Sequence, residues 1–408
     1  MAHHARPDVS RRSVLRGAAG LAAGGVAVPF LSSCMNGPQA SGPQYPIPTP
    51  DNPMKLPVFD DNPPVEGGLE PEGSSTLKVL NYAEYLAPGV RKAFREEFGA
   101  EVEVTPYGDF EELQRKLLEP GAEYDVVFAG PSIMSRLVHG RLIQPFNAEY
   151  LPNVKNLWPE FQDPWYDRRA RYSVPYNVYS YGIGYRKDRV DQVPDNGYMM
   201  LWDPRYAGRV GIFDDAIDAL SMTLAAWGIS TDINTDAPDL VNAAKDKLIE
   251  LLALDVTVSI AQYQLVPSGQ VTVHQAWSGD FTFADSYTTG DTTIDDIGYW
   301  VPADRSERIV GNETISIPKP SNNPVLAHAF INYLLDEGVA ETNCSWTGYF
   351  PPLTKLTPDY LVEQEIVYES LRSTVVEAAD MAAGKQHTEL TVPVRNVWLR
   401  AWQEFKSA

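Results

Sequence analysis

Residues 76–130 read TLKVLNYAEYLAPGVRKAFREEFGAEVEVTPYGDFEELQRKLLEPGAEYDVVFAG, in which short apolar runs alternate with segments of helical periodicity. The apolar runs predict strands, at 78–82, 101–105 and 125–128. The segments between them predict helices, one over 89–98 and one with a capping-box-like start at Asp109 and Glu112. Regular alternation of strands and helices is typical of α/β layers around a mainly parallel sheet. Ligands of such sheets bind beyond the carboxyl ends of the strands.

The same alternation continues towards the C-terminus. Further strands are predicted at 210–213, 271–276 and 314–317, and further helices at 133–139, 216–227, 239–254 and 324–335. At roughly 150 residues per domain, a chain of 408 residues suggests two or three domains. The net charge of −21 disfavours a nucleic-acid binder, which needs a positive surface. It fits either a cationic ligand or an ordinary acidic surface outside the cytoplasm.

The first 34 residues have the composition of an export signal. Residues 10–16, SRRSVLR, precede a weakly apolar run over 17–31 that is too short for a bilayer-spanning helix of about 20 residues. The paired arginines resemble a twin-arginine signal. Residues 31–34, LSSC, resemble a bacterial lipobox, so Cys34 is expected to carry a lipid on the outer face of the cytoplasmic membrane. The alternative is a buried or disulfide-bonded Cys34; once lipidated, it could form no disulfide with Cys344, the other cysteine.

A proline-rich segment follows over residues 34–76, which hold ten of the 33 prolines. Such sequence favours extended chain, so we expect a semi-rigid spacer between the lipid and the folded body. An apolar trio within it, Leu56, Val58 and Phe59, is a candidate for docking on the body.

Acids and aromatic residues gather at or beside the predicted strand ends. The candidate ligand-binding residues are Tyr82, Tyr85, Ser132, Asp215, Asp218, Trp277, Glu313 and Tyr349. An ammonium group removed from water needs a carboxylate or a ring face, and methylene segments need flat apolar walls, so the set suits an organic cation. Asp215 could instead cap a helix, and the aromatic residues could be core. Two close carboxylates at Asp215 and Asp218 repel unless a cation joins them.

Short motifs occur in a fixed order over residues 77–408. They are NYAEY at 81–85, YDVV at 124–127, LIQ at 142–144, YSVPY at 172–176, GIG at 182–184, LWDPRYAG at 201–208, DDA at 214–216 and GY at 348–349. In these motifs the chain resembles the substrate-binding proteins of bacterial ABC importers for spermidine and putrescine, within the extracellular solute-binding proteins. The resemblance implies a two-lobed α/β fold of type II-like periplasmic-binding-protein architecture. The implied lobes are 77–182 with 311–357, and 183–310 with 358–408.

The resemblance also implies roles for the candidate residues. The acids for the polyamine would be Asp215, Asp218 and Glu313, and the aromatic walls Tyr82, Tyr85, Trp277 and Tyr349. The chain departs from the family at four positions: it has Tyr82 and Gly311 where tryptophans are usual, Ala83 where a hydroxyl residue is usual, and Asp218 where a glutamate is usual. A polar amide contact of the family falls near Thr388 or Glu389. The implied partners are a membrane permease and its ATPase.

Two other kinds of function stay open. The first is a receptor for a different amine or for ferric ion, which tyrosines such as Tyr349 could hold. The second is a secreted lipoprotein enzyme, but the chain lacks His-Glu-x-x-His, Gly-x-Ser-x-Gly and Walker motifs. Its histidines beyond the signal lack metal-ligand spacing, and Cys344 is an isolated cysteine. We therefore expect a monomeric receptor that holds a polyamine without a metal or cofactor and performs no catalysis.

Overall fold

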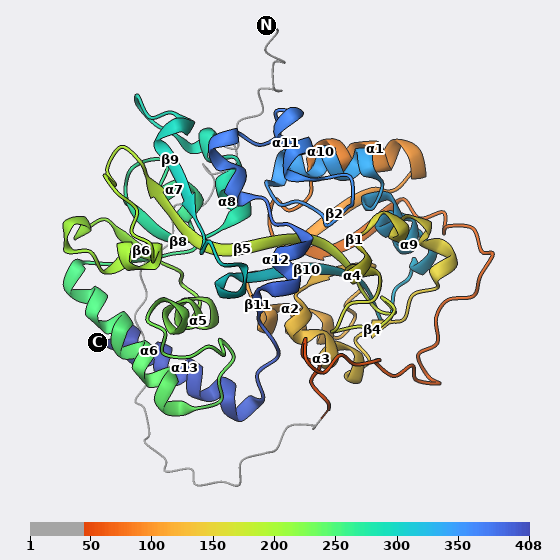
Figure 1. Cartoon of the computed structure of the whole chain (residues 1–408). Helices are drawn as coiled ribbons and strands as arrows, with labels where there is room; N and C mark the ends of the chain where they lie inside the picture. Colours follow the sequence, from red (N-terminus) through yellow and green to blue (C-terminus); the bar gives the residue numbers. More distant parts are fainter. Residues whose placement is uncertain (1–44) are drawn as a thin grey trace, which may run out of the picture. The chain divides into compact units, whose positions relative to one another are not determined.

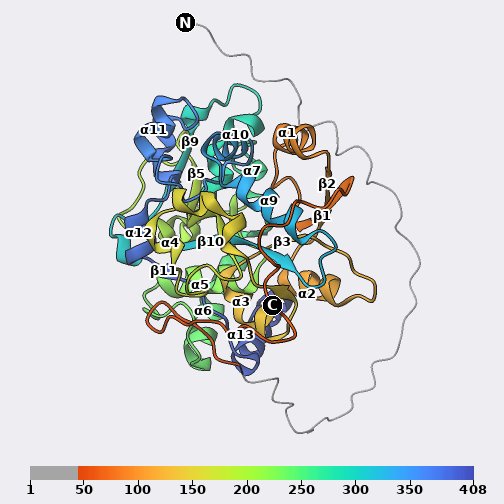
Figure 2. The same ribbon diagram turned by 90° about the vertical axis from the view of Figure 1, so that its right-hand side faces the viewer.

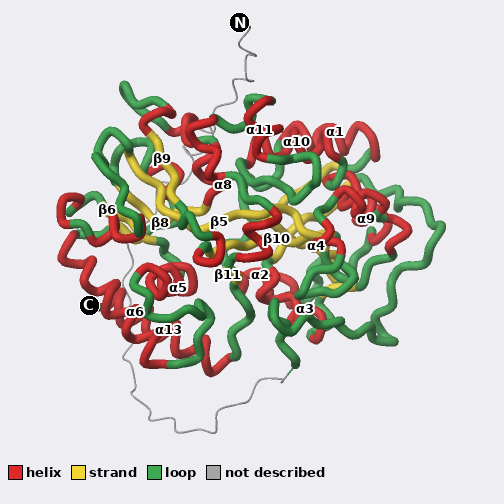
Figure 3. The backbone as a smooth tube through the Cα atoms, viewed as in Figure 1, coloured by secondary structure: helices red, strands yellow, loops and turns green. Residues whose placement is uncertain are grey.

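The computed structural model of the chain describes residues 45–408; Cys34 and the paired arginines lie outside the described residues. Within residues 45–408, eleven strands form one sheet with helices on its faces (Figure 1 and Figure 3). The strands are β1 (Thr76–Asn81), β2 (Glu101–Pro106), β3 (Val126–Ala129), β4 (Ile143–Gln144), β5 (Val174–Arg186), β6 (Val210–Ile212), β7 (Thr257–Val258), β8 (Val273–Trp277), β9 (Ile297–Trp300), β10 (Ile309–Pro318) and β11 (Lys385–Gln386).

The six predicted helices are present to within a few residues, and the structure adds others, of which α13 is the longest. The α-helices are α1 (Pro88–Phe98), α2 (Phe110–Leu118), α3 (Met134–His139), α4 (Pro159–Gln162), α5 (Ala216–Ala226), α6 (Pro238–Glu250), α7 (Gln262–Leu265), α8 (Ser278–Thr282), α9 (Pro324–Leu334), α10 (Glu337–Thr347), α11 (Pro358–Glu363), α12 (Ala378–Ala383) and α13 (Val392–Ser407). Asp109 caps α2 as predicted, because its carboxylate accepts a hydrogen bond from the backbone N–H of Glu112 at 2.7 Å. Helices α1 and α2 lie on opposite faces of β1 and β2 (Figure 2).

The sheet is mixed. Its order is β2-β1-β3-β10-β5-β8-β6-β7, with β4 and β11 beside β10 and β9 beside β5. Strands β1, β2 and β3 pair in parallel, as do β6, β7 and β8. Strands β5 and β10 run antiparallel to each other. Strand β10 also runs antiparallel to its other neighbour β3, and β5 runs antiparallel to its other neighbour β8. The α/β prediction is confirmed, and the parallel pairs lie at the two ends of the sheet and between β10 and the short strand β11.

Two large hydrophobic cores lie on either side of the central strand pair. Strand β5 contributes Tyr176 and Val178 to the first core, which also holds β1, β3 and α9. The same strand contributes Tyr181 and Ile183 to the second core, which also holds α5, α6 and α13. The pair β5 and β10 therefore crosses between two lobes (Figure 1). The residue bounds of the lobes stay a prediction.

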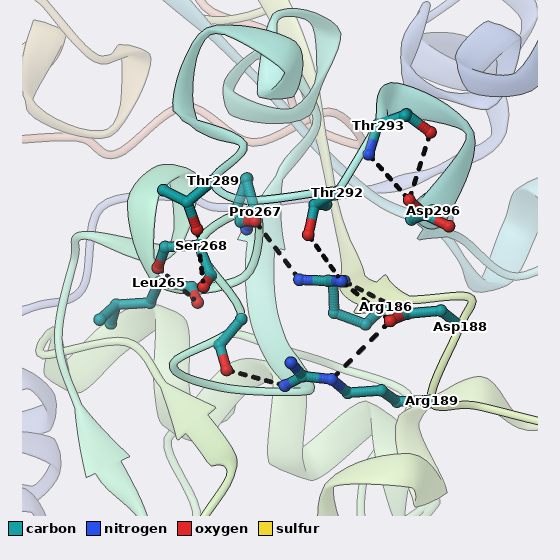
Figure 4. A network of polar contacts seen from close by, with 11 residues as sticks. Arg186, Asp188, Arg189, Leu265, Pro267, Ser268, Thr289, Thr292, Thr293 and Asp296 are labelled. Atoms are coloured by element: carbon teal, nitrogen blue, oxygen red, sulfur yellow. Dashed lines mark hydrogen bonds and ion pairs between the residues drawn. The ribbon is translucent and has the colours of Figure 1, made fainter.

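The end of β5 is fixed by a polar network around Arg186 (Figure 4). The buried guanidinium donates to both carboxylate oxygens of Asp188, at 2.8 and 2.9 Å, and to the hydroxyl of Thr292 at 2.9 Å. Arg189 donates to the carbonyl oxygen of Gly269 at 2.7 Å. Because charged hydrogen bonds restrain geometry strongly, the network holds β5 against two loops of the second lobe.

The proline-rich segment is not a free spacer over the residues that the structure describes. Its Leu56 is part of the first core, and the buried Asn62 donates to the carbonyl oxygen of Ile143 at 2.9 Å. Further along, Glu72 accepts hydrogen bonds from the first backbone N–H groups of α9, at 3.1 and 2.8 Å. The composition predicted an extended chain. The backbone groups of an extended chain are free to form hydrogen bonds with the folded body. Residues 45–75 therefore form a strap on the first lobe.

Truncating Leu56 to alanine is expected to lower the free energy of unfolding by about 3 kcal/mol, because a leucine that is 1% exposed leaves a cavity. Urea unfolding measures the loss. The matched control is Val58→Ala, which removes a side chain that is 43% exposed and is expected to cost under about 0.5 kcal/mol. Equal stability of the two variants would show that the strap is not packed in solution.

Two further observations concern the membrane and the cysteines. No helix within residues 45–408 is both long and apolar enough to cross a bilayer. Cys344 is fully buried on α10 as a free thiol, and burial raises its pKa. A thiol in that state is a poor nucleophile, which agrees with a structural role.

Candidate ligand-binding site

The candidate site lies on one face of the two crossing strands. In the register of the sheet, Gly311 lies opposite Tyr179 and Glu313 lies opposite Asn177. Tyr181 lies opposite Trp277 of β8. Opposed residues share a face, and residues two apart along a strand share it too. Strands β5, β8 and β10 thus present three rings and a carboxylate to the same side.

Glu313 is the most deeply placed acid of this face. It is 6% exposed and sits at a β-bulge, where the pairing of β10 with β5 shifts between Glu313 and Thr314. Its Oε2 has no hydrogen-bond partner within the described residues. Burial raises the pKa of Glu313 to about 8, although the neighbouring Tyr179 hydroxyl acts in the opposite direction. A buried carboxylate with an unused oxygen is prepared for a cation.

Phenols surround Glu313 from the first lobe. Tyr82 and Tyr85 follow β1, with ring centroids 5.4 Å apart, and Tyr107 follows β2, with its ring centroid 4.5 Å from that of Tyr82. Burial raises the pKa of all three phenols, and the charge of Glu313 raises it further. The structure thus brings the predicted residues Tyr82 and Tyr85 next to the predicted acid.

Tyr349 joins this group from the loop after α10. Its hydroxyl donates to Oδ1 of Asp280 at 2.9 Å, and its ring centroid lies 5.2 Å from that of Tyr85. The approach depends on two glycines. A Cβ on Gly348 would lie 2.2 Å from the carbonyl oxygen of Gly279, and Gly348 has a φ of 79°, which favours glycine.

The second acid of the site is Asp218, in the first turn of α5. The indole Nε1 of Trp277 donates to its Oδ2 at 3.1 Å, and the Trp277 ring stacks on Phe213 at 4.4 Å. Burial raises the pKa of Asp218 well above its usual range, and the charges of Asp215 and Glu313 raise it further. The two acids therefore influence each other electrostatically, although they come from different elements.

Asp215 takes the alternative role that the sequence left open. Its Oδ1 accepts hydrogen bonds from the backbone N–H groups of Ile217 and Asp218, at 2.8 and 2.9 Å, so it caps α5. Ser132 lies half-buried after β3, and within the described residues no hydrogen bond or ring contact joins it to the acids. A ligand role for these two residues stays a prediction.

Sequence reasoning missed several residues of the site. They are Tyr107, Tyr179, Tyr181 and His387. The Tyr181 hydroxyl lies 3.2 Å from Nδ1 of His387, whose Nε2 lies 2.9 Å from the Ser221 hydroxyl. Burial lowers the pKa of His387 to about 4, so this ring carries no charge at neutral pH. The alternate positions of Asn177, Tyr179 and Tyr181 were the available signal, since residues two apart share a face.

The segment after His387 turns away from the acids. Glu389, one of two positions proposed for the amide contact, accepts hydrogen bonds from Arg136 at 2.9 Å and from the Tyr45 hydroxyl at 2.6 Å. At the other position, the Thr388 backbone N–H donates to Oδ1 of Asn234 at 2.9 Å. The structure thus gives these two residues partners of their own outside the acid and phenol group.

The charge of the site is uncompensated. Within residues 45–408, no lysine or arginine forms an ion pair with Glu313 or Asp218, and His387, whose Nδ1 lies 3.9 Å from Oδ1 of Asp218, is uncharged at neutral pH. No group of three or more His, Cys, Asp or Glu side chains among these residues is placed to hold a metal ion. Two buried acids without a counter-ion must hold protons or receive a cation. The surrounding phenols offer ring faces and hydroxyl oxygens to such a cation.

The chain is similar to known proteins over most of its length. A family model described as bacterial extracellular solute-binding protein matches residues 89–366. A spermidine/putrescine-binding periplasmic protein of Escherichia coli (strain K12) is 28% identical over 299 residues, 72% of this chain and 82% of that protein. The solved spermidine/putrescine ABC transporter substrate-binding protein PotD of Streptococcus pneumoniae is 22% identical, with a TM-score of 0.67, over 82% of this chain and 99% of that chain.

The same fold also serves another ligand. The iron-bound protein HitA of Pseudomonas aeruginosa is 17% identical, with a TM-score of 0.57, over 81% of this chain and 99% of that chain. Similarity at these identities establishes the shared two-lobed fold and leaves the ligand to the site residues. Since the family model covers more than half of the sequence, the chain belongs to the bacterial extracellular solute-binding proteins.

Proposed function

We propose that the protein is the extracytoplasmic receptor of an ABC importer and that it captures a linear polyamine such as putrescine or spermidine. One ammonium group binds at Glu313 and another at Asp218, with the methylene chain against the rings of Tyr85, Trp277 and Tyr349. The unpartnered, buried Oε2 of Glu313 among phenols carries this proposal. The similarity to polyamine-binding proteins supports the same ligand class. The receptor hands the ligand to a permease and its ATPase, and it performs no chemistry on the ligand.

Titration calorimetry with putrescine, cadaverine, spermidine, spermine and a neutral disaccharide tests the ligand class. Binding of at least one polyamine and no binding of the sugar is the expected result, because only the polyamine supplies cations to both acids. Heat from the sugar alone would refute the proposal. A purified protein that turns coloured with ferric ion and ignores every polyamine would favour iron instead.

The same proposal places the receptor, as a monomer, on the outer face of the cytoplasmic membrane through a lipid on Cys34. The support is the sequence alone: the paired arginines and the lipobox-like residues 31–34. Changing Cys34 to serine is expected to move the protein from the membrane fraction to the soluble fraction, because the thiol that takes the lipid is removed. Immunoblots of the two fractions check this, and Cys344→Ser is the control that leaves the distribution unchanged. A Cys34→Ser variant that stays membrane-bound would contradict the anchor.

A further inference from the structure

Tyr179 occupies the centre of the site and has no role in the function described so far. It lies on β5 directly opposite Gly311 of β10, two residues from Glu313. A Cβ on Gly311 would lie 3.0 Å from Cε2, Cζ and Oη of the Tyr179 ring. The phenol therefore lies over the glycine backbone, and the absence of a side chain at Gly311 makes room for it. The ring is half-buried, so its surface is not wholly taken up by packing.

The neighbours of Tyr179 lie on both sides of it, one in the group around Glu313 and one towards Asp218. Its ring centroid lies 6.1 Å from that of Tyr349, which belongs to the group around Glu313. It lies 5.6 Å from that of Tyr181, on the side of Asp218. The charges of both acids, Glu313 and Asp218, raise the pKa of the Tyr179 hydroxyl. Tyr179 is thus the phenol between the two acids.

We propose that Tyr179 is a ligand-contacting residue that sets specificity: its hydroxyl oxygen and the free Oε2 of Glu313 together receive the N–H groups of a primary ammonium. This inference rests on the proposed polyamine function, and it identifies the primary ammonium group as the part of the ligand that the protein recognises. A primary ammonium has three N–H donors, and two acceptors on neighbouring side chains fix their direction. An ammonium whose hydrogens are replaced by methyl groups leaves both acceptors unpaired.

Ring faces alone would not make this distinction. An aromatic box holds a quaternary ammonium well, because the attraction between a cation and a ring face requires no N–H group. A site with buried polar groups, in contrast, rejects an analogue that lacks the matching donors, since the polar groups then stay unsatisfied. Glu313 and the Tyr179 hydroxyl supply such polar groups within the box of phenols.

The test compares Tyr179→Phe with the wild type for two ligands: putrescine, and the doubly quaternary analogue in which both nitrogens carry three methyl groups. Phenylalanine keeps the ring and removes the hydroxyl. Putrescine affinity is expected to fall on the order of tenfold, as for loss of one hydrogen bond to a charged group, while the weak affinity for the quaternary analogue changes less than about twofold. The control is Tyr185→Phe, on the same strand but outside the site. It is expected to leave unchanged the ratio of the affinity for putrescine to the affinity for the quaternary analogue.

The pH dependence of putrescine binding gives a second readout that a purely structural role would not move. Six titratable side chains interact electrostatically with Glu313: Tyr82, Tyr85, Tyr107, Tyr166, Tyr179 and Asp218. The Tyr179 hydroxyl holds the pKa of Glu313 down. In Tyr179→Phe, the pH above which putrescine affinity stops rising is therefore expected to move upward.

The outcomes separate this inference from the proposed function. A tenfold fall in the affinity ratio with an upward pH shift supports the role of Tyr179. A wild type that binds putrescine and a Tyr179→Phe variant with the same ratio and pH profile would overturn that role and leave the receptor function intact. A wild type that binds no diamine at all would overturn both. Gly311→Ala, whose Cβ meets the Tyr179 ring, is expected to lower putrescine affinity in the same direction.

Discussion

Replacing Glu313 with glutamine is expected to weaken putrescine binding at pH 7.5 by about 100-fold, or about 3 kcal/mol, in titration calorimetry. Glutamine has the same shape but cannot become the anion that neutralises a buried ammonium. The ammonium would then lie among the phenols around position 313 with no carboxylate beside it to balance its charge. The loss of one member of a desolvated charge pair is the largest single effect that the site geometry offers.

A separate measurement shows that the loss is not a folding defect. The pKa of Glu313 is about 8 in the folded protein, against an ordinary value of 4.5, so the empty wild type loses stability as the pH rises from 4.5 to 8. Glutamine has no such penalty. At pH 9 the empty Glu313→Gln variant is therefore expected to melt at a higher temperature than the empty wild type.

The matched control for this experiment is Glu307→Gln. Glu307 precedes β10 on the surface, where it pairs with Lys385 at 2.7 Å. Its replacement is expected to leave both putrescine affinity and the melting temperature at pH 9 unchanged. Equal putrescine affinity in Glu313→Gln and wild type would remove Glu313 from the site.

The sequence named Glu313 and Asp218 as candidate acids but did not reveal β5, the strand between them. All but two residues of β5 are buried, so apolar and polar positions do not alternate, and Gly182 and Gly184 weaken the strand signal further. The structure explains both glycines by close approach. A Cβ on Gly184 would lie 1.8 Å from the Phe281 ring, and one on Gly182 would lie 2.2 Å from the carbonyl oxygen of Trp300. Such contacts join segments about a hundred residues apart, which local periodicity does not record.

Asp215 and Leu56 show the same limit in two other ways. An aspartate at a helix start has the same sequence signature whether it caps the helix or binds a cation. Only the structure shows that the Oδ1 of Asp215 accepts two backbone N–H groups as a cap, and a ligand role for this residue stays a prediction. For Leu56, the proline content predicted a spacer and gave no sign of the packing of the strap on the first core. Which apolar side chain reaches the core depends on the surface that the strap meets, and only Leu56 of the trio is fully buried.

Putrescine affinity is expected to rise by at least about tenfold per pH unit from pH 6 to pH 7.5, the slope for release of one proton from Glu313, and to level off above about pH 8. Below its pKa of about 8, Glu313 of the empty protein is mostly protonated, whereas the complex with an ammonium needs the carboxylate. Binding must therefore release a proton, which becomes less costly as the pH rises. The ligand amines do not oppose this trend, because their pKa values, like that of lysine, lie near 10.

Asp218 adds to the same linkage, since its pKa is also raised well above its usual range by burial and by neighbouring carboxylates. Calorimetry in two buffers of different ionisation heat gives the number of protons released on binding. At pH 7 the wild type is expected to release about one proton more than the Glu313→Gln variant. Solvent-exposed acids, whose ordinary pKa values lie near 4, would give a flat affinity profile over this range. A flat profile would therefore mean that the ammonium does not meet a buried, protonated acid, and the placement of the ligand at Glu313 would fail with it.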